Sequence, residues 1–265
     1  MPGGWMYDRQ QNVFVRPFCP QREVQVFHIK MIRTWSVLPL VAAGLFVSQQ
    51  LTAQHYNNLW ARTTFVYTPI PSMRLDAELQ HRRQNVWKKE NIMGQNLLFS
   101  FRQWIHYQYN KDVRFSLSPF ALFSNYKVTS PSEINTAPPL KEIRVAAATD
   151  VQHSLSHRFH LSDRTGLEYR MFQNGQKNIV RLRIRPGLRY DLGHRTRLMV
   201  YDEILLNMNN SHHFFDQNRM GMSAEYSFSP HLRLEAGYLH IVRLPLSSEH
   251  LLRENNLVVN LTCLL

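Results

Sequence analysis

Apolar and polar residues alternate along most of the chain. In the clearest segment, 180–191, Val180 and Leu182 fall on one face, whereas Arg181 and Arg183 fall on the other. As a helix this segment would spread its arginines around the whole circumference, so the period of two predicts a strand. The alternation therefore indicates an all-β fold.

Ten further segments show the same period, and many of them contain 10–15 residues. They are 59–68, 73–82, 94–109, 113–126, 142–156, 159–172, 196–207, 219–228, 232–239 and 256–265. Strands in soluble β-sandwiches usually have about 5–6 residues, whereas about 9–11 residues cross a bilayer at a tilt. Bacterial single-chain barrels have even strand numbers. The eleven segments therefore predict ten or twelve strands, with twelve slightly favoured.

Short and long connections alternate between these segments. The short ones lie at 69–72, 110–112, 191–194 and 229–231, and the long ones at 84–93, 128–141, 173–178, 209–217 and 245–254. Tight periplasmic turns and larger external loops are typical of outer-membrane barrels. The sequence therefore predicts an antiparallel transmembrane β-barrel of about 10–12 strands.

An apolar stretch at 37–47 precedes the predicted strands. It is too short for a membrane-spanning helix, which needs about 20 residues. It follows Met31 and Arg33 and is followed by polar residues, the pattern of a cleavable secretory signal. We expect cleavage after Ala53; a buried helix is the alternative interpretation.

This assignment divides the chain into three parts. We interpret 1–30 as an N-terminal extension from a mis-assigned translation start, 31–53 as the signal peptide and 54–265 as the barrel domain. Of the two cysteines of the chain, only Cys263 would remain after cleavage, which excludes an intramolecular disulfide and a cysteine metal cluster.

The composition agrees with a barrel in the outer membrane. A mean hydropathy of −0.35 excludes a bundle of membrane-spanning helices, but not a barrel, whose strands need an apolar residue only at alternate positions. Removal of 1–53 takes five basic and two acidic residues, so the net charge falls from +12 to +9. Such a charge can indicate nucleic-acid binding, but an exported chain rarely meets nucleic acid. We expect outer-membrane lipid and the barrel-assembly machinery as partners, and a monomer.

Charged residues on the polar faces are expected to point into the lumen, because an Arg or Lys facing the middle of the bilayer costs about 2–4 kcal/mol. The predicted lumen-facing residues are Arg74, Glu78, Arg82, Glu142, Arg144, Glu168, Arg170, Arg181, Arg183, Arg185, Arg189, Glu203, Arg219, Glu225, Arg233 and Glu235. They could fill the interior as Arg–Glu pairs, which is the favoured interpretation, or line a pore that favours anions.

Catalysis and metal binding find little support in the sequence. Ser211, His212, His213 and Asn218 are the candidates for a membrane-embedded lipid hydrolase, but they fall in or beside a polar loop, in no motif resembling the known enzymes. Three histidines lie in 153–160, but on a strand the first two would be about 13 Å apart, too far for one ion unless a turn lies between them. Interfacial or turn histidines are the favoured interpretation. We therefore expect no catalytic residues, no metal and no cofactor.

Several motifs resemble those of a family of uncharacterised bacterial proteins. They are Leu198-Met-Val-Tyr-Asp-Glu203, Phe214-Phe-Asp-Gln-Asn-Arg219 and Ala236-Gly-Tyr238, accompanied by the arginine-rich 181–190 segment and Trp60. This family of Gram-negative bacteria is best known from Bacteroidota, and its members are regarded as outer-membrane β-barrels of unknown function. The resemblance spans roughly 57–265.

The resemblance implies a fold but no activity. The chain departs from the usual barrel ending, which favours a final aromatic residue, because it ends in Leu265. We expect an outer-membrane β-barrel without identifiable catalytic activity, either a structural component or a narrow channel with a charged lumen. A membrane-embedded lipid hydrolase and a soluble periplasmic ligand-binding barrel of the lipocalin kind are the alternatives.

Overall fold

The regular structure of the chain consists of β-strands. A computed structural model describes residues 55–85, 91–126, 138–210, 213–245 and 250–265, and it contains no helix in these ranges. Within them, therefore, no helix is long and apolar enough to cross a bilayer. The predicted extension at 1–30 and the predicted signal peptide at 31–53 lie outside the described residues.

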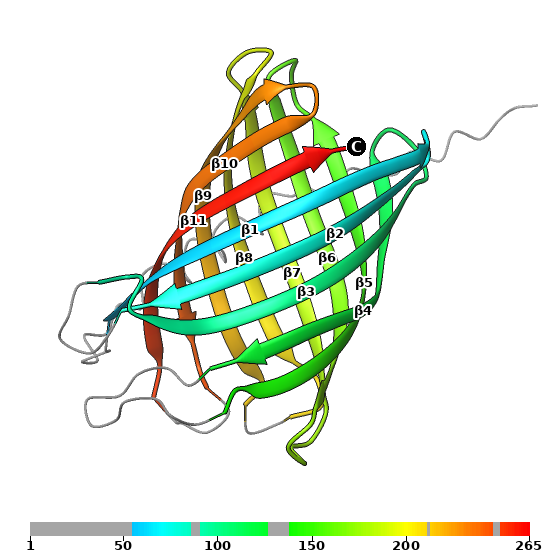
Figure 1. The fold of residues 1–265 in the computed structure, drawn as a ribbon. Coiled ribbons are helices and arrows are strands. Elements are labelled where there is room, and N and C mark those ends of the chain that lie inside the picture. Colours follow the sequence, from blue (N-terminus) through cyan, green and yellow to red (C-terminus); the bar gives the residue numbers. More distant parts are fainter. Residues whose placement is uncertain (1–54, 86–90, 127–137, 211–212, 246–249) are drawn as a thin grey trace, which may run out of the picture. The chain divides into compact units, whose positions relative to one another are not determined.

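Eleven strands follow one another along the chain (Figure 1), and each contains at least 12 residues. They are β1 (His55–Ile70), β2 (Met73–Gln84), β3 (Gln95–Gln108), β4 (Val113–Asn125), β5 (Leu140–Ser154), β6 (Phe159–Phe172), β7 (Ile179–Asp191), β8 (Thr196–Asn207), β9 (Phe215–Ser229), β10 (Leu232–Arg243) and β11 (Leu252–Leu264). The eleven segments of alternating residues correspond one to one to these strands.

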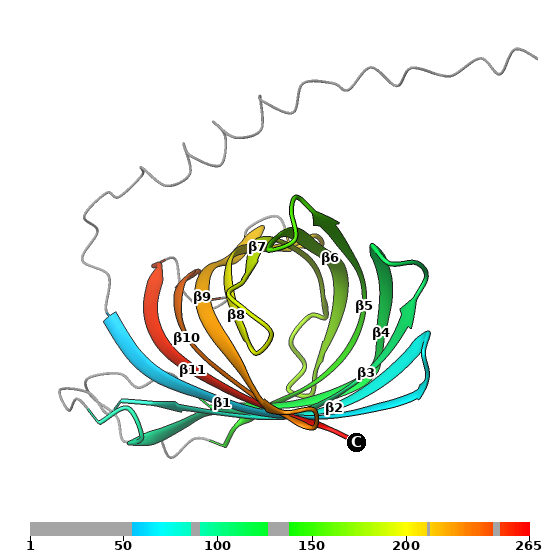
Figure 2. The ribbon, with the colours of Figure 1, turned by 90° about the horizontal axis from the view of Figure 1, so that it is seen from above.

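The strands form a closed barrel, seen end-on in Figure 2. Neighbours in sequence pair antiparallel, and the ring is closed by β1 and β11, which run parallel from His55 opposite Arg253 to Val66 opposite Leu264. The predicted all-β barrel fold is thus confirmed. The expectation of an even strand number was wrong: with eleven strands the first and last point the same way, so closure requires a parallel pair.

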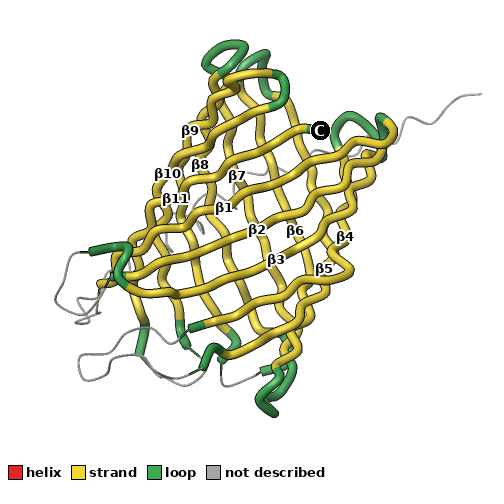
Figure 3. Tube along the Cα trace, viewed as in Figure 1, coloured by secondary structure: helices red, strands yellow, loops and turns green. Residues whose placement is uncertain are grey.

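The connections fall into two sets at opposite ends of the barrel, and their described parts are drawn in green in Figure 3. Five short turns lie at one end, at 71–72, 109–112, 155–158, 192–195 and 230–231, and five longer connections lie at the other, at 85–94, 126–139, 173–178, 208–214 and 244–251. We call these ends the short-turn end and the long-loop end. At the short-turn end, Asn110 Oδ1 accepts hydrogen bonds from the backbone N–H groups of Asp112 and Val113, both at 2.8 Å. Such a side-chain bond holds a tight turn between two strands.

The two faces of the barrel wall differ in polarity. Val200 on β8 and Met222 on β9 point outward and are 57% and 60% exposed. Their strand neighbours on the opposite face include Glu203 on β8, which is 3% exposed. The aliphatic faces therefore lie outside and the charged faces inside. A soluble barrel that binds a ligand in an apolar interior would need the reverse arrangement.

Two prolines interrupt the regular pairing of the wall. The registers of β3 with β4 and of β4 with β5 both shift around Pro119. Pro186 lies where the β7–β8 pairing skips from Ile184 to Gly187. Proline has no N–H to donate to a ladder, so it is tolerated at bulges and gaps.

Candidate functional site

The charged interior of the barrel is the candidate functional site. Alternation on β7 puts Arg181, Arg183 and Arg185 on the inner face of one strand. Strand register then brings acids to them: Glu168 on β6 lies directly opposite Arg181, and Glu203 on β8 lies directly opposite Arg219 on β9. The arginines and the carboxylates are therefore placed together by backbone pairing alone.

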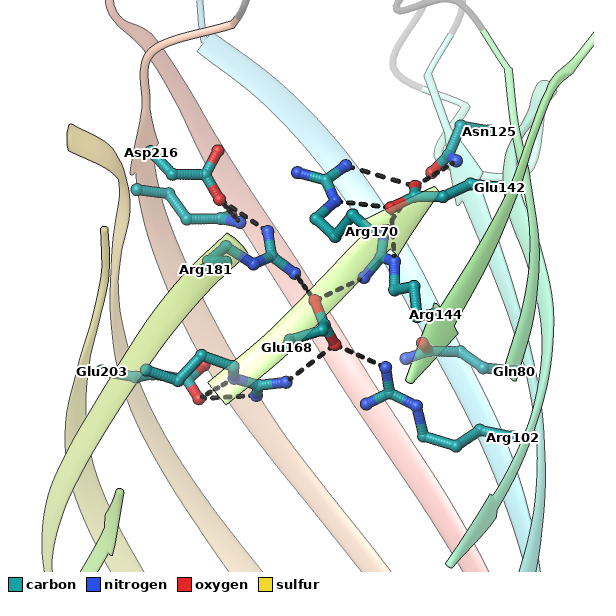
Figure 4. Close-up of polar contacts among 12 residues, drawn as sticks. Gln80, Arg102, Asn125, Glu142, Arg144, Glu168, Arg170, Arg181, Glu203 and Asp216 are labelled. Atoms are coloured by element: carbon teal, nitrogen blue, oxygen red, sulfur yellow. Dashed lines mark hydrogen bonds and ion pairs between the residues drawn. The ribbon is translucent and has the colours of Figure 1, made fainter. Parts of the chain in front are cut away.

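Glu168 is the centre of this arrangement (Figure 4). Its buried carboxylate accepts from Arg102 at 2.6 Å and from Arg144 at 3.4 Å, and it also forms an ion pair with Arg181. Arg183 Nη1 lies 3.7 Å away. These four arginines come from β3, β5 and β7. Because β3 is not a neighbour of β6, the bond from Arg102 spans part of the lumen.

Glu142 on β5 forms a second centre nearer the long-loop end. Its side chain is fully buried and accepts from Arg144 Nε at 2.8 Å and from Arg170 Nε at 2.5 Å. Asn125 on β4 adds a hydrogen bond of 3.2 Å to the same carboxylate. Arg144 bonds both Glu142 and Glu168, so the two centres are joined.

Two further acids complete the connected set. Glu203 Oε1 accepts from Arg183 at 2.6 Å, and its Oε2 accepts from Arg219 at 3.0 Å. Asp216 accepts from Arg181 at 2.6 Å. We call the whole set the lumen cluster; it comprises Arg102, Glu142, Arg144, Glu168, Arg170, Arg181, Arg183, Glu203, Asp216 and Arg219.

Smaller ion pairs lie toward the two ends of the barrel. At the short-turn end, Asp150 pairs with Arg164 at 3.0 Å and with Arg114 at 3.4 Å. At the long-loop end, Arg243 Nε lies 2.6 Å from Glu254. Carboxylates and arginines thus recur along the length of the lumen, as charge-assisted hydrogen bonds that satisfy one another.

Three cavities follow one another along the lumen. A cavity of about 670 Å³ opens toward the long-loop end, one of about 250 Å³ lies in the middle, and one of about 230 Å³ lies toward the short-turn end. The first two share Arg82, Arg144, Arg181 and Arg219 in their walls, and the last two share Arg185. Arginine side chains therefore separate each cavity from the next.

Most of the sixteen residues expected to face the lumen form ion pairs. These are Arg74, Glu78, Glu142, Arg144, Glu168, Arg170, Arg181, Arg183, Arg189, Glu203, Arg219 and Glu225. Glu235 accepts hydrogen bonds from Ser223 and Asn260 instead. Arg82 donates to Gln80, and its guanidinium lies 3.3 Å from the centre of the Trp60 ring.

Arg185 and Arg233 are the two exceptions. Neither side chain forms a hydrogen bond or an ion pair with any residue in the described part of the chain. Arg185 lines the middle cavity and lies 5.4 Å from the ring centre of Tyr201. Arg233 lies two residues before Glu235, on the same strand face.

Sequence reasoning missed several residues of the site. Asp216 was assigned to a polar loop, but it lies on β9, where a register shift between Leu205 and Leu206 accompanies the burial of two consecutive side chains, Asp216 and Gln217. Arg102 was overlooked because its segment is rich in aromatic residues and carries few charges. Its position in phase with Ser100 and Trp104 on the inner face was the available signal.

The residues considered for catalysis are not assembled into a site in the described structure. Asn218 lies on the outer face of β9 and donates to Asp202 at 2.6 Å. His213 lies in the β8–β9 connection, where its backbone oxygen accepts from Asn207. Ser211 and His212 lie outside the described residues. No group of three or more His, Cys, Asp or Glu side chains that could hold a metal ion occurs within the described ranges.

Comparison with known proteins identifies a family without assigning an activity. A family described as "Protein of unknown function (DUF2490)" matches residues 57–243, most of the chain. The chain therefore belongs to the DUF2490 family. No curated protein matches the chain.

Proposed function

We propose that this member of the DUF2490 family spans the outer membrane. The outward side chains support the proposal, since large apolar residues such as Leu167, Val200 and Met222 are more than half exposed on the barrel wall. In water such a surface would be costly, because burial of apolar area contributes about 25 cal/mol per Å². Outer-membrane lipid would cover this face, and the barrel-assembly machinery would insert the chain as a monomer.

Aromatic residues at the short-turn end support the same placement. Phe159 and Tyr190 lie side by side there, with ring centres 4.6 Å apart, and Tyr226 and Phe228 lie 4.9 Å apart. Aromatic girdles mark the membrane–water interfaces of outer-membrane barrels. By the same rule, the short turns would face the periplasm and the long loops the exterior.

We propose further that the barrel is a structural membrane component whose lumen is closed to all but small solutes. The observation that carries this proposal is the convergence of four arginines on Glu168, one of them from the non-neighbouring strand β3. Open porins keep a water-filled channel, whereas ion pairs here occupy the middle of the lumen. Asn218, bonded to Asp202 on the outer face, does not support a lipid hydrolase.

A narrow channel is the second candidate, and one observation favours it. The three cavities lie in series and share arginine side chains in their walls. A path through them would run past positive charge, and rings of Arg or Lys favour anions.

Recording from the refolded protein in planar bilayers tests both candidates. We expect no stable conductance steps of the size of an open porin from a lumen braced by ion pairs. Small anion-selective steps would favour the narrow channel. Large, weakly selective steps would contradict the closed lumen.

A further inference from the structure

The middle cavity of the lumen has an unusual charge balance. Its wall includes eight arginines but three glutamates, contributed by strands from nearly the whole ring. The charged lining residues are Arg62, Arg82, Arg102, Arg144, Arg181, Arg183, Arg185, Arg219, Glu78, Glu203 and Glu235. The ion pairs of the lumen cluster do not remove this excess, because six arginines of that cluster share four carboxylates.

Two arginines of the cavity have no acidic partner among the described residues. Arg82 bonds the neutral side chain of Gln80 and stacks on Trp60. Arg185 contacts the ring of Tyr201. Neither side chain can lose its positive charge, since the guanidinium group stays protonated in proteins. Both positive charges therefore face the lumen without a carboxylate of the described residues within ion-pair distance.

Several hydrogen-bond donors in the wall of the middle cavity also have no acceptor among the described residues. Trp60 Nε1 is buried, as are Arg62 Nε and Arg82 Nε, and none of these atoms meets an acceptor among the described residues. A buried donor without a partner costs about 1–3 kcal/mol. Donors and positive charge thus surround one space. The ligand that satisfies both is an anion with several oxygen acceptors.

The geometry points to a binding site for a small free oxyanion of the phosphate type in the middle cavity, whose wall includes Arg82 and Arg185. The cavity of about 250 Å³ is smaller than the roughly 300–1,000 Å³ of sites for drug-sized ligands, so it suits an ion with its waters. Arg82 is fixed against Trp60, with 3.3 Å between its guanidinium carbon and the ring centre. Binding would supply the negative charge that the lumen cluster lacks.

This site depends on the lumen and not on where the barrel resides. Its charged lining residues are inner-face side chains, so a lipid phosphate on the outside of the barrel cannot reach them. The inference would hold for a closed lumen or for a narrow channel, in which the ion would be a transient occupant. If the protein were found outside the membrane, the proposed anion site would be unaffected, so the membrane proposal and the anion site can be tested separately.

The test is calorimetric titration of inorganic phosphate into the full-length, detergent-solubilised protein at low ionic strength. We expect saturable binding at one site. The variants Arg185→Gln and Arg82→Gln should each raise the Kd about tenfold, because each removes one positive charge from the wall of the cavity. The matched control is Arg233→Gln, which removes an inward arginine that does not line the cavity. Its Kd should equal that of the unaltered protein.

Folding of each variant is checked by the faster gel migration of the unboiled barrel. If Arg185→Gln does not fold, Arg82→Gln alone provides the comparison of Kd values. Absence of saturable phosphate binding to the unaltered protein would overturn the inference. The same Kd in the unaltered protein and in all folded variants would also overturn it.

Discussion

Arg102 on β3 and Glu168 on β6 form an ion pair of 2.6 Å although two strands separate them in the barrel wall. The side chain of Glu168 is fully buried, and that of Arg102 is nearly so. Their bond ties together parts of the wall that backbone pairing leaves unconnected. It braces the middle of the lumen at the point where an open pore would hold water.

Removal of the Glu168 charge is expected to destabilise the barrel strongly. Glu168→Gln leaves Arg102, Arg144 and Arg181 with less negative charge in a buried setting, and breaking buried pairs typically costs about 3–5 kcal/mol. The measurement is urea unfolding in detergent, followed by gel migration without boiling. Glu225→Gln is the matched control, because Glu225 is partly exposed and, among the described residues, pairs with Arg197 alone. The control should lose less than about 1 kcal/mol, and a loss for Glu168→Gln no larger than that of the control would contradict a charge-balancing role of Glu168.

The orientation of the wall can be tested at two neighbouring positions of β7. Ile184 points outward and Arg185 inward, so in the proposed membrane barrel Ile184→Arg would place a charge against lipid at a cost of about 2–4 kcal/mol. Arg185→Ser removes a charge that has no acidic partner within the described structure, and the barrel should still fold. Refolding yield into lipid vesicles measures both. A larger loss for Arg185→Ser than for Ile184→Arg would mean that the faces are reversed.

Asp202 and Glu203 are adjacent acids on opposite faces of β8. Asp202 lies outside, near the middle of its strand, and accepts one hydrogen bond from Asn218. Asp202→Leu should therefore leave insertion unchanged or improve it by up to about 1 kcal/mol, since outward acids are mildly unfavourable. Glu203→Leu should reduce stability, because Arg183 and Arg219 lose their shared partner. Equal effects of the two substitutions on vesicle refolding would argue against a lipid-facing Asp202.

Close approach of β9 and β10 explains why a glycine is found at position 237. A Cβ at Gly237 would lie 2.5 Å from the backbone oxygen of Met222 and 2.6 Å from Ser223 Cβ, whereas a Cβ at Gly193 meets nothing within 4 Å. Overpacking of this kind typically costs about 1–3 kcal/mol. We expect Gly237→Ala to lower the urea midpoint of unfolding and Gly193→Ala to leave it in place. The opposite order would contradict the packing of β9 against β10.

The sequence predicts the strands and their inner and outer faces well, because the alternation of apolar and polar residues can be recognised without knowing which strands are neighbours. Arg181 and Arg183 share a face whatever strands lie beside β7, and the eleven alternating segments are the eleven strands. The strand number was misjudged because the even-number rule is statistical. The parallel pairing of β1 with β11 results from closure of the barrel, and no local sequence pattern indicates which strands close it.

Contacts across the lumen escape sequence reasoning for a different reason. The pairing of Arg102 with Glu168 depends on the stagger of several strands, so it cannot be inferred from either segment alone. Asp216 was missed because the irregular pairing at the start of β9 breaks the alternation there. Sequence thus indicates which residues can enter the lumen, whereas the barrel geometry decides which of them meet.

The most direct test of the membrane barrel is fractionation of cells that express the protein, combined with gel migration of boiled and unboiled samples. We expect the protein to be recovered with the outer membrane and the unboiled sample to migrate faster than the boiled one. Recovery as a monodisperse soluble protein without detergent would contradict a membrane-spanning barrel, because the apolar outer face would then have to be stable in water.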